Sequence, residues 1–203
     1  MNDILQGNVT DKLKEIETAT VQCVVTSPPY WGLRDYGVKG QLGLEETPEE
    51  YVENLVDILR EVKRVLRNDG TLWLNLGDSY VGTGAKGKHK DPKSDSRNAQ
   101  STTAVNNRVV GLKPKDMVGI PWRVAFALQA QGWWLRSDII WHKPNPMPES
   151  IKDRPTSAHE KIWLITKSKK YYYDADAIKE PTTESTKQRY KSGWKGNEER
   201  DYV

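Results

Sequence analysis

The spacing of apolar residues changes along this chain from the period of a strand to that of a helix and back. The short run VQCVV at 21–25 is typical of a fully buried strand, and it predicts that Cys23 lies in the core. In TLWLNLGD, at 71–78, leucine occupies every second position, as in a strand with one buried face. A helix signal separates the two, so the sequence predicts a β–α–β unit with parallel strands.

Residues 47–70 carry that helix signal. Thr47 and Glu50 have the spacing of a capping box, and Pro48 stands at the first helical position. Gly70 is expected to end the helix. The apolar residues recur at helical spacing and should form the buried face, namely Tyr51, Leu55, Ile58, Leu59, Val62, Val65 and Leu66.

The remaining pattern extends the sheet. DMVGIPWRVAFALQAQGW at 116–133 predicts a second helix, and LRSDIIWHK at 135–143 and EKIWLITKS at 160–168 predict two strands that pair antiparallel at a sheet edge. We therefore expect an α/β fold with a mostly parallel sheet. The domain is expected over 1–180, and the polar tail 181–203, which lacks periodicity, is expected to be disordered.

Composition narrows the class of protein. The 203 residues suit one domain, and the sequence contains neither a membrane-length apolar stretch nor a signal peptide, which predicts a cytoplasmic protein. A single cysteine excludes a disulfide framework and a multi-cysteine zinc site within this sequence. The three histidines show no metal-ligand spacing, so no metal is expected.

Positive charge gathers in one segment, residues 82–108. Its surplus of four exceeds the net charge of +3 for the whole chain. Two interpretations stay open, a solvated mobile linker and a basic arm for a phosphate backbone. The glycines of GTGAKG at 82–87 match the dinucleotide pattern formally, but no helix signal follows, and we reject that interpretation. The charged residues are Lys86, Lys88, Lys90, Lys93, Arg97 and Arg108 against Asp91 and Asp95.

The most unusual sequence, TSPPY, follows the first predicted strand, at the edge where open parallel sheets bind ligands. Pro28 and Pro29 fix the backbone and should leave their carbonyls without local donors. Ser27 adds a hydroxyl acceptor, and Tyr30 offers a flat ring for stacking. Two acceptors beside such a ring would hold an aromatic amino group and make its lone pair available for attack. A base in duplex DNA reaches such a pocket only by flipping out.

TSPPY also matches the (D/N/S)-P-P-(Y/F/W) motif, and through it the chain resembles the amino-methylating DNA methyltransferases. The approach NDILQGN, the W-x-K-x-N-x-x-P segment at 138–148 and the HE-x-I segment at 154–174 resemble the same family in the beta arrangement. The resemblance implies a Rossmann-like sheet, S-adenosylmethionine as methyl donor, and double-stranded DNA as partner. It also implies a bacterial or phage restriction–modification setting.

Individual roles follow from this resemblance. The catalytic group would be Ser27, Pro28, Pro29 and Tyr30. Asn8 replaces the aspartate usual in the family; it either accepts from the donor's adenine amine or is a turn residue. The donor would be bound by Asn8, Thr26 and Ser27, and DNA by Trp31, Lys86, Lys88, Lys90, Lys143 and Asn145.

Other residues keep two interpretations each. Trp31, Tyr36 and Trp141 share two interpretations: the ring stacks on a base, or it covers the core. His159 and Glu160 fit a structural role, supporting the TSPPY corner.

Several alternatives remain open at this stage. The resemblance alone implies that serine at position 27 favours cytosine N4 over adenine N6. Carbon-5 methylation is disfavoured because it requires a cysteine nucleophile, and Cys23 is expected in a core strand. The family's D-P-F-x-G-S-G-T-like donor turn does not occur in these 203 residues, so we expect a sheet that is incomplete at its C-terminal side. The alternative function is a truncated or split homologue that binds DNA but is inactive alone, completed by a second polypeptide or a further segment. Another planar amine as substrate and a homodimer also stay open.

Overall fold

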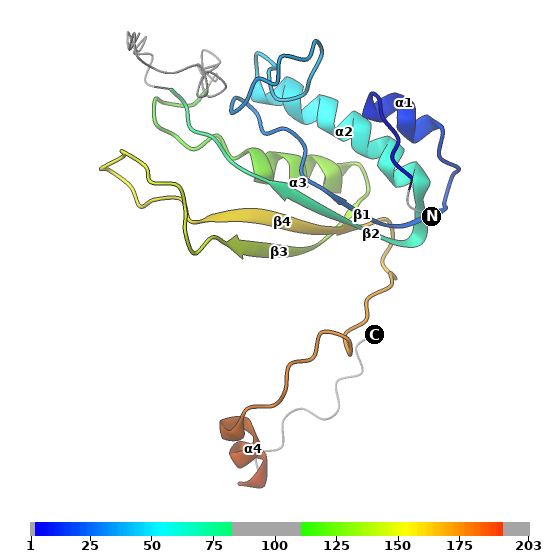
Figure 1. Ribbon diagram of the computed structural model, residues 1–203, viewed down its shortest axis with the longest axis vertical. Helices are drawn as coiled ribbons and strands as arrows, with labels where there is room; N and C mark the ends of the chain where they lie inside the picture. Colours follow the sequence, from blue (N-terminus) through cyan, green and yellow to red (C-terminus); the bar gives the residue numbers. More distant parts are fainter. Residues whose placement is uncertain (1–2, 83–110, 193–203) are drawn as a thin grey trace. The chain divides into compact units, whose positions relative to one another are not determined.

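The computed structural model describes residues 3–82 and 111–192, which form two units, Met1–Tyr172 and Tyr173–Val203. The described residues of the first unit form one four-stranded sheet and three helices, and those of the second form one helix (Figure 1). The elements are α1 (Val9–Lys14), β1 (Val21–Thr26), α2 (Pro48–Val65), β2 (Leu66–Leu76), α3 (Ile120–Ala130), β3 (Trp134–His142), β4 (His159–Thr166) and α4 (Glu184–Lys191).

The strands follow the order β1-β2-β4-β3. β1 and β2 pair in parallel, with Val24 opposite Leu72, and this confirms the predicted β–α–β unit. β4 runs antiparallel to both β2 and β3, so three strands share one direction and β4 runs against them. The predicted antiparallel pair therefore does form one edge of the sheet, with β3 outermost.

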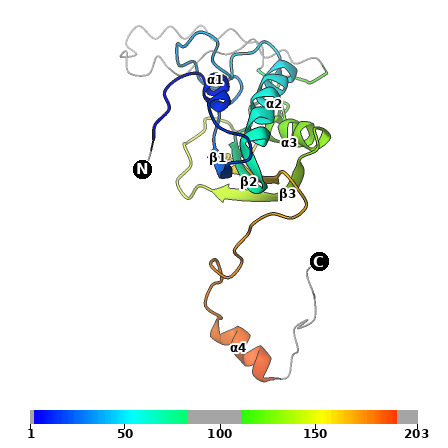
Figure 2. The ribbon, with the colours of Figure 1, turned by 90° about the vertical axis from the view of Figure 1, so that its right-hand side faces the viewer.

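Helices cover one face of the sheet. Figures 1 and 2 show α1, α2 and α3 on the same side, and Leu72, Leu74 and Leu76 of β2 point into the core beneath them. The capping box of α2 is present, since Thr47 Oγ1 accepts from the Glu50 amide at 3.1 Å and the Glu50 side chain accepts from the Thr47 amide. The apolar stripe of α2 and these leucines belong to one hydrophobic core, and their burial stabilises this unit.

The predicted end of α2 was wrong. The helix ends at Val65, because Leu66 adopts an extended conformation and enters the sheet opposite Val21. Gly70 lies inside β2, where a Cβ atom would approach the Gln22 carbonyl oxygen to 3.1 Å. The glycine therefore permits close strand approach instead of ending a helix.

Two helices were not predicted. Asn8 caps the short α1, with its side-chain oxygen accepting from the Thr10 amide at 2.9 Å. α4 lies within the tail that we expected to be disordered, where Thr183 accepts from the Thr186 amide. α3 is shorter than predicted at both ends, beginning at Ile120.

The prediction for Cys23 was also wrong. Its side chain is exposed, and Val25 is 78% exposed. β1 is an edge strand, and among the described residues of this unit no helix lies on the sheet face opposite α2 (Figure 2). One face of the VQCVV run is consequently open. No helix within 3–82 and 111–192 has the length and apolar character needed to cross a bilayer.

Asp78 joins the end of β2 to the start of α3. Gly119, in the left-handed region at φ 79°, provides no side-chain cap for this helix. Asp78 Oδ1 accepts instead from the amides of Gly119 at 2.9 Å and Ile120 at 3.0 Å. Burial raises the pKa of the Asp78 carboxyl, although these amides and that of Ser79 oppose the rise. A side chain remote in sequence thus satisfies the first amides of α3.

We expect Asp78→Ala to lower the free energy of unfolding by about 1–2 kcal/mol, because two helix amides lose their acceptor. Asp78→Asn retains a side-chain oxygen, so its free energy of unfolding should fall clearly less than that of Asp78→Ala. Urea denaturation of the two variants measures the difference. Equal midpoints for Asp78→Ala and the unsubstituted chain would contradict the capping role.

Candidate active site

The TSPPY sequence forms a rigid turn, which we call the SPPY corner (residues 27–30), directly after β1. One of its two proline carbonyls is already used, contrary to expectation, because the Tyr51 hydroxyl of α2 donates to the Pro29 oxygen at 2.9 Å. Burial raises the pKa of Tyr51, so its hydroxyl stays protonated as that donor. Among the described residues the Pro28 carbonyl receives no hydrogen bond. α2 therefore fixes one carbonyl of the corner and leaves the other available.

The ring of Tyr30 rests against the backbone at the end of β2. A Cβ atom built on Gly77 would lie 2.5 Å from Tyr30 Cε2 and 2.6 Å from Cδ2. No real side chain tolerates such a contact, so only glycine leaves space for the ring here. Gly77 is outside the left-handed region, which makes its role steric and not conformational.

Three side chains surround the hydroxyl of Tyr30. Tyr30 donates to Glu160 Oε2 at 3.0 Å. It accepts from Asn75 Nδ2 at 3.0 Å and from Ser27 Oγ at 3.2 Å. Because Ser27 uses its hydrogen on Tyr30, the lone pairs of its oxygen stay free to accept from another group.

The Tyr30 hydroxyl is neutral, and the negative charge of Glu160 beside it is paired with the positive charge of Lys143. Burial, together with the Glu160 charge, raises the pKa of Tyr30 to about 12 despite the hydrogen bond from Ser27, so the phenol is neutral. Burial also raises the pKa of Glu160, but hydrogen bonds from Lys143, Asn75 and Tyr30 outweigh it and hold that pKa below its ordinary value. Glu160 is thus a carboxylate paired with the Lys143 ammonium.

A hollow of about 390 Å³, which we call the corner hollow, opens at this point. It contains the Ser27 hydroxyl, the Tyr30 ring and the Glu160 carboxylate, and Tyr36 supplies a second aromatic side chain. Its volume suits a planar heteroaromatic ring together with surrounding water. The lining residues are Ser27, Pro28, Pro29, Tyr30, Leu33, Arg34, Tyr36 and Glu160.

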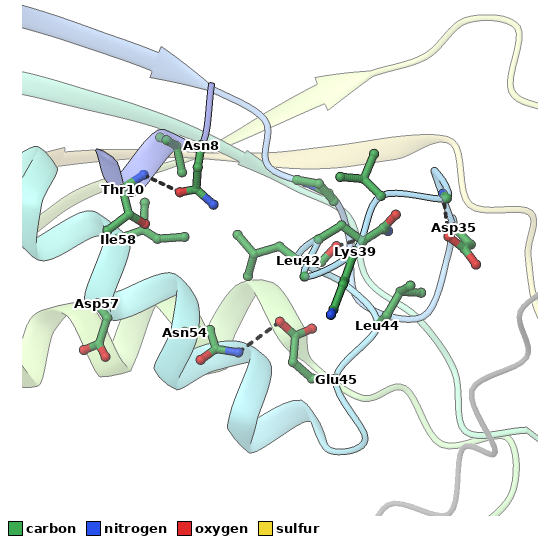
Figure 3. Close-up of a pocket in the computed structure, with 16 residues that line it drawn as sticks. Asn8, Thr10, Asp35, Lys39, Leu42, Leu44, Glu45, Asn54, Asp57 and Ile58 are labelled. Carbon is green, nitrogen blue, oxygen red and sulfur yellow. Dashed lines mark hydrogen bonds between the residues drawn. The ribbon is translucent and has the colours of Figure 1, made fainter. Parts of the chain in front are cut away.

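A larger cavity of about 1090 Å³, the α2 cavity, lies between α1, α2 and the loop that joins β1 to α2 (Figure 3). Pro29 lines both this cavity and the corner hollow. Asn8 directs its amide nitrogen into the space (Figure 3), since its oxygen caps α1. Glu45 accepts from the Gly43 amide at 2.8 Å and from Asn54 at 3.1 Å. The two spaces can hold one molecule each, one on either side of Pro29.

Comparison with known proteins shows which family this chain belongs to. A family model described as DNA methylase (N6_N4_Mtase) matches residues 21–202, nearly the whole chain. The chain belongs to the DNA methylase family.

Relatives within the DNA methylase family are close. The type II methyltransferase M.SmaI of Serratia marcescens is 52% identical over 181 residues, which are 89% of this chain and 61% of the relative. M.XycI of Xanthomonas campestris pv. cyanopsidis is 50% identical over 194 residues, 96% of this chain and 64% of the relative. The chain thus spans about three fifths of the length of these relatives.

Solved structures show the same fold. The cytosine-N4-specific PvuII DNA methyltransferase superposes with a TM-score of 0.57 at 17% identity, covering 96% of this chain and 64% of that one. A putative DNA modification methylase of Thermus thermophilus, solved in complex with S-adenosyl-L-methionine, gives a TM-score of 0.53 at 23% identity, with 92% and 57% covered. These neighbours establish a Rossmann-like methyltransferase sheet for this chain.

The lining of the α2 cavity fits an adenosine group such as that of S-adenosyl-L-methionine, which the Thermus thermophilus neighbour binds. An adenosine needs apolar surface for its ring and polar groups for its nitrogens and ribose hydroxyls. Val9, Leu42 and Ile58 supply the first, and Asn8 and Glu45 supply the second. The Asn8 nitrogen faces the cavity, so Asn8 would donate to a ring nitrogen; we expected its oxygen to accept from the adenine amine. In the described ranges no group of three or more potential metal ligands occurs.

The structure places the other predicted residues as follows. Trp31 is a core residue, 1% exposed, whose Nε1 donates to the Glu45 carbonyl at 3.0 Å, so its predicted DNA contact was wrong. Thr26 ends β1 opposite Leu74 and does not line the α2 cavity. Lys143 pairs with Glu160, and Asn145 is exposed in the segment after β3. The remaining three, Lys86, Lys88 and Lys90, lie outside the described residues.

Three residues of the site were missed. Asn75 is the one amide in the apolar alternation TLWLNL, and a polar residue inside such a strand is a usable signal. Gly77 directly follows that strand, where glycine often marks a close approach. Tyr51 matched the α2 core stripe, and nothing in the sequence distinguishes its hydroxyl contact with Pro29.

Gly77→Ala should destabilise the chain by about 1–3 kcal/mol, because the new methyl group overlaps the Tyr30 ring. In a Tyr30→Ala background the space is empty, and the same substitution should cost much less. Urea unfolding of the four variants gives the coupling free energy. An equal cost in both backgrounds would contradict the steric contact.

Proposed function

We propose that this chain carries the base-binding and catalytic part of a site-specific DNA methyltransferase, which transfers a methyl group from S-adenosylmethionine to the exocyclic amine of a flipped base. One observation supports this most strongly. In the corner hollow the lone pairs of Ser27 and the carbonyl of Pro28 lie beside the Tyr30 ring, and no group within the described part of the chain donates to them. Two acceptors and a stacking surface are what an aromatic amine requires.

The chemistry follows from those acceptors. An amine conjugated to a base is a weak nucleophile, because its lone pair is delocalised into the ring. Hydrogen bonds from both N–H groups to Ser27 and Pro28 would draw the nitrogen toward tetrahedral geometry and localise the lone pair. The bound donor supplies an electrophilic methyl group. As the new N–C bond forms, the S–C bond of the donor breaks, and the surplus proton leaves the nitrogen for solvent.

The base that best fits this proposal is cytosine, methylated at N4, with adenine N6 as second choice. Serine at position 27 supports cytosine. Carbon-5 methylation requires a cysteine nucleophile, and Cys23 does not line the corner hollow. A DNA substrate is supported by the description of the matching family, DNA methylase. The bacterial origin of the type II methyltransferase relatives supports a cytoplasmic location.

Contacts to the DNA strand would come from two places. Lys143 and Asn145 lie after β3, beside Trp141, which is 51% exposed. The lysines of segment 82–108 supply further positive charge for phosphates.

Ser27→Ala should lower methyl transfer about 100-fold, because one of the two amine acceptors is lost. The measurement is incorporation of label from radioactive S-adenosylmethionine into unmethylated bacterial DNA. Ser137→Ala, an exposed serine on β3, is the matched control and should retain full activity. Undiminished transfer by Ser27→Ala would refute the assignment of the SPPY corner.

The alternative proposal is that this chain binds DNA but requires a second polypeptide or a further segment to bind the donor. It is supported by the share of the relatives' length that the chain spans, 61% and 64% for two of them. Calorimetry with S-adenosylmethionine separates the two proposals. Micromolar binding by this chain would exclude the alternative, and no binding together with DNA affinity would favour it.

Replacing Lys86, Lys88 and Lys90 together with alanine should weaken DNA binding and flatten its salt dependence, by up to about 2.7 in the slope of log K against log salt. Fluorescence anisotropy with a labelled duplex at several salt concentrations measures both. Lys169→Ala/Lys170→Ala, at exposed positions after β4, is the control and should leave the slope unchanged. An unchanged slope in the triple variant would exclude the basic arm.

A further inference from the structure

Glu160 occupies the centre of a polar cluster that joins every strand of the sheet. It receives hydrogen bonds from Tyr30 after β1, Asn75 of β2 and Lys143 after β3, and it belongs to β4 itself. The register explains the convergence: Asn75 lies opposite Ile162, so Glu160 is its diagonal neighbour on the same face.

We propose that Glu160 is a positioning residue that locks the Tyr30 ring in the orientation needed to stack on the target base. This inference rests on the proposed function. Glu160 does not react with the base or the donor; it acts through Tyr30.

The hydrogen-bonding capacity of the Tyr30 phenol is fully used. A tyrosine hydroxyl has one hydrogen and two lone pairs. Glu160 accepts the hydrogen, and Asn75 and Ser27 donate to the oxygen. Rotation of the ring away from its position therefore breaks three bonds at once. A ring that only packs in the core needs no such arrangement.

Asn75 is itself held by Glu160. Its amide nitrogen donates to Tyr30 at 3.0 Å and to Glu160 Oε2 at 2.9 Å. Both amide hydrogens are therefore used within the cluster. Loss of the Glu160 carboxylate removes the acceptor from Tyr30 and from Asn75 together.

The backbone at Gly77 restricts the ring sterically. Gly77 permits the ring to lie against the backbone, where a single methyl group would approach it to 2.5 Å. The ring is thus limited on one side by the backbone and at its hydroxyl by hydrogen bonds. The ring can still move if the Glu160 side chain moves, and the ion pair between Glu160 and Lys143 restricts that movement.

The test begins with the ring itself and needs no enzymatic activity. The chain is labelled with 3-fluorotyrosine, and the Tyr30 resonance is assigned by its loss in Tyr30→Phe. In Glu160→Ala this resonance should move toward the shift of the unfolded chain. In Asp138→Ala it should stay in place, because Asp138 forms a similar ion pair with Lys161 between β3 and β4 without touching Tyr30.

The second measurement is methyl transfer by the same variants. Glu160→Ala should lower kcat about tenfold and leave KM for S-adenosylmethionine unchanged, because Glu160 does not line the α2 cavity. The double variant with Tyr30→Phe should lose less activity than the sum of the two single losses, since both substitutions remove the hydrogen bond between Tyr30 and Glu160.

An unmoved Tyr30 resonance in Glu160→Ala overturns the inference, whatever happens to stability or activity. A moved resonance with kcat at the unsubstituted value also overturns it. If the unsubstituted chain transfers no methyl group although it binds the donor, the proposed function fails, and the fluorine resonance alone decides whether Glu160 holds the ring.

Discussion

The site depends on the hydrogen bonds of one half-buried phenol, that of Tyr30. Tyr30 has its single hydrogen and both lone pairs engaged, and a pKa of about 12 keeps that hydrogen in place at any physiological pH. Because its partners come from β2, β4 and the SPPY corner, the ring can hold its position only when the sheet is assembled. The free acceptors of Ser27 and Pro28 are presented beside a surface that the whole fold orients.

The parallel pairing of β1 and β2 determines where the SPPY corner lies. Both strands end at the same edge, so Tyr30 of the corner after β1 meets Gly77 after β2. Tyr51 of α2 binds the Pro29 carbonyl, and Pro29 separates the corner hollow from the α2 cavity. A methyl acceptor in the corner hollow and a methyl donor in the α2 cavity would thus lie on the two sides of the same short turn.

Local signals in the sequence predicted much of the fold and the centre of the site. The capping box of α2, the alternating leucines of β2 and the TSPPY corner are each read within a few residues, and each is present. The contacts made by Glu160 and Asn75 depend on β4 entering the sheet between β2 and β3, a long-range pairing that periodicity does not encode. Trp31 and Cys23 were misplaced for the same reason, since their exposure depends on which face the helices cover.

In the proposed function the SPPY corner activates an exocyclic amine. The most direct measurement is mass spectrometry of nucleosides from unmethylated DNA incubated with the chain and S-adenosylmethionine, together with the same experiment on Ser27→Ala. We expect N4-methylcytosine as the product, in strongly reduced amount with the variant. 5-Methylcytosine, or a methylated amine formed equally by Ser27→Ala, would contradict it.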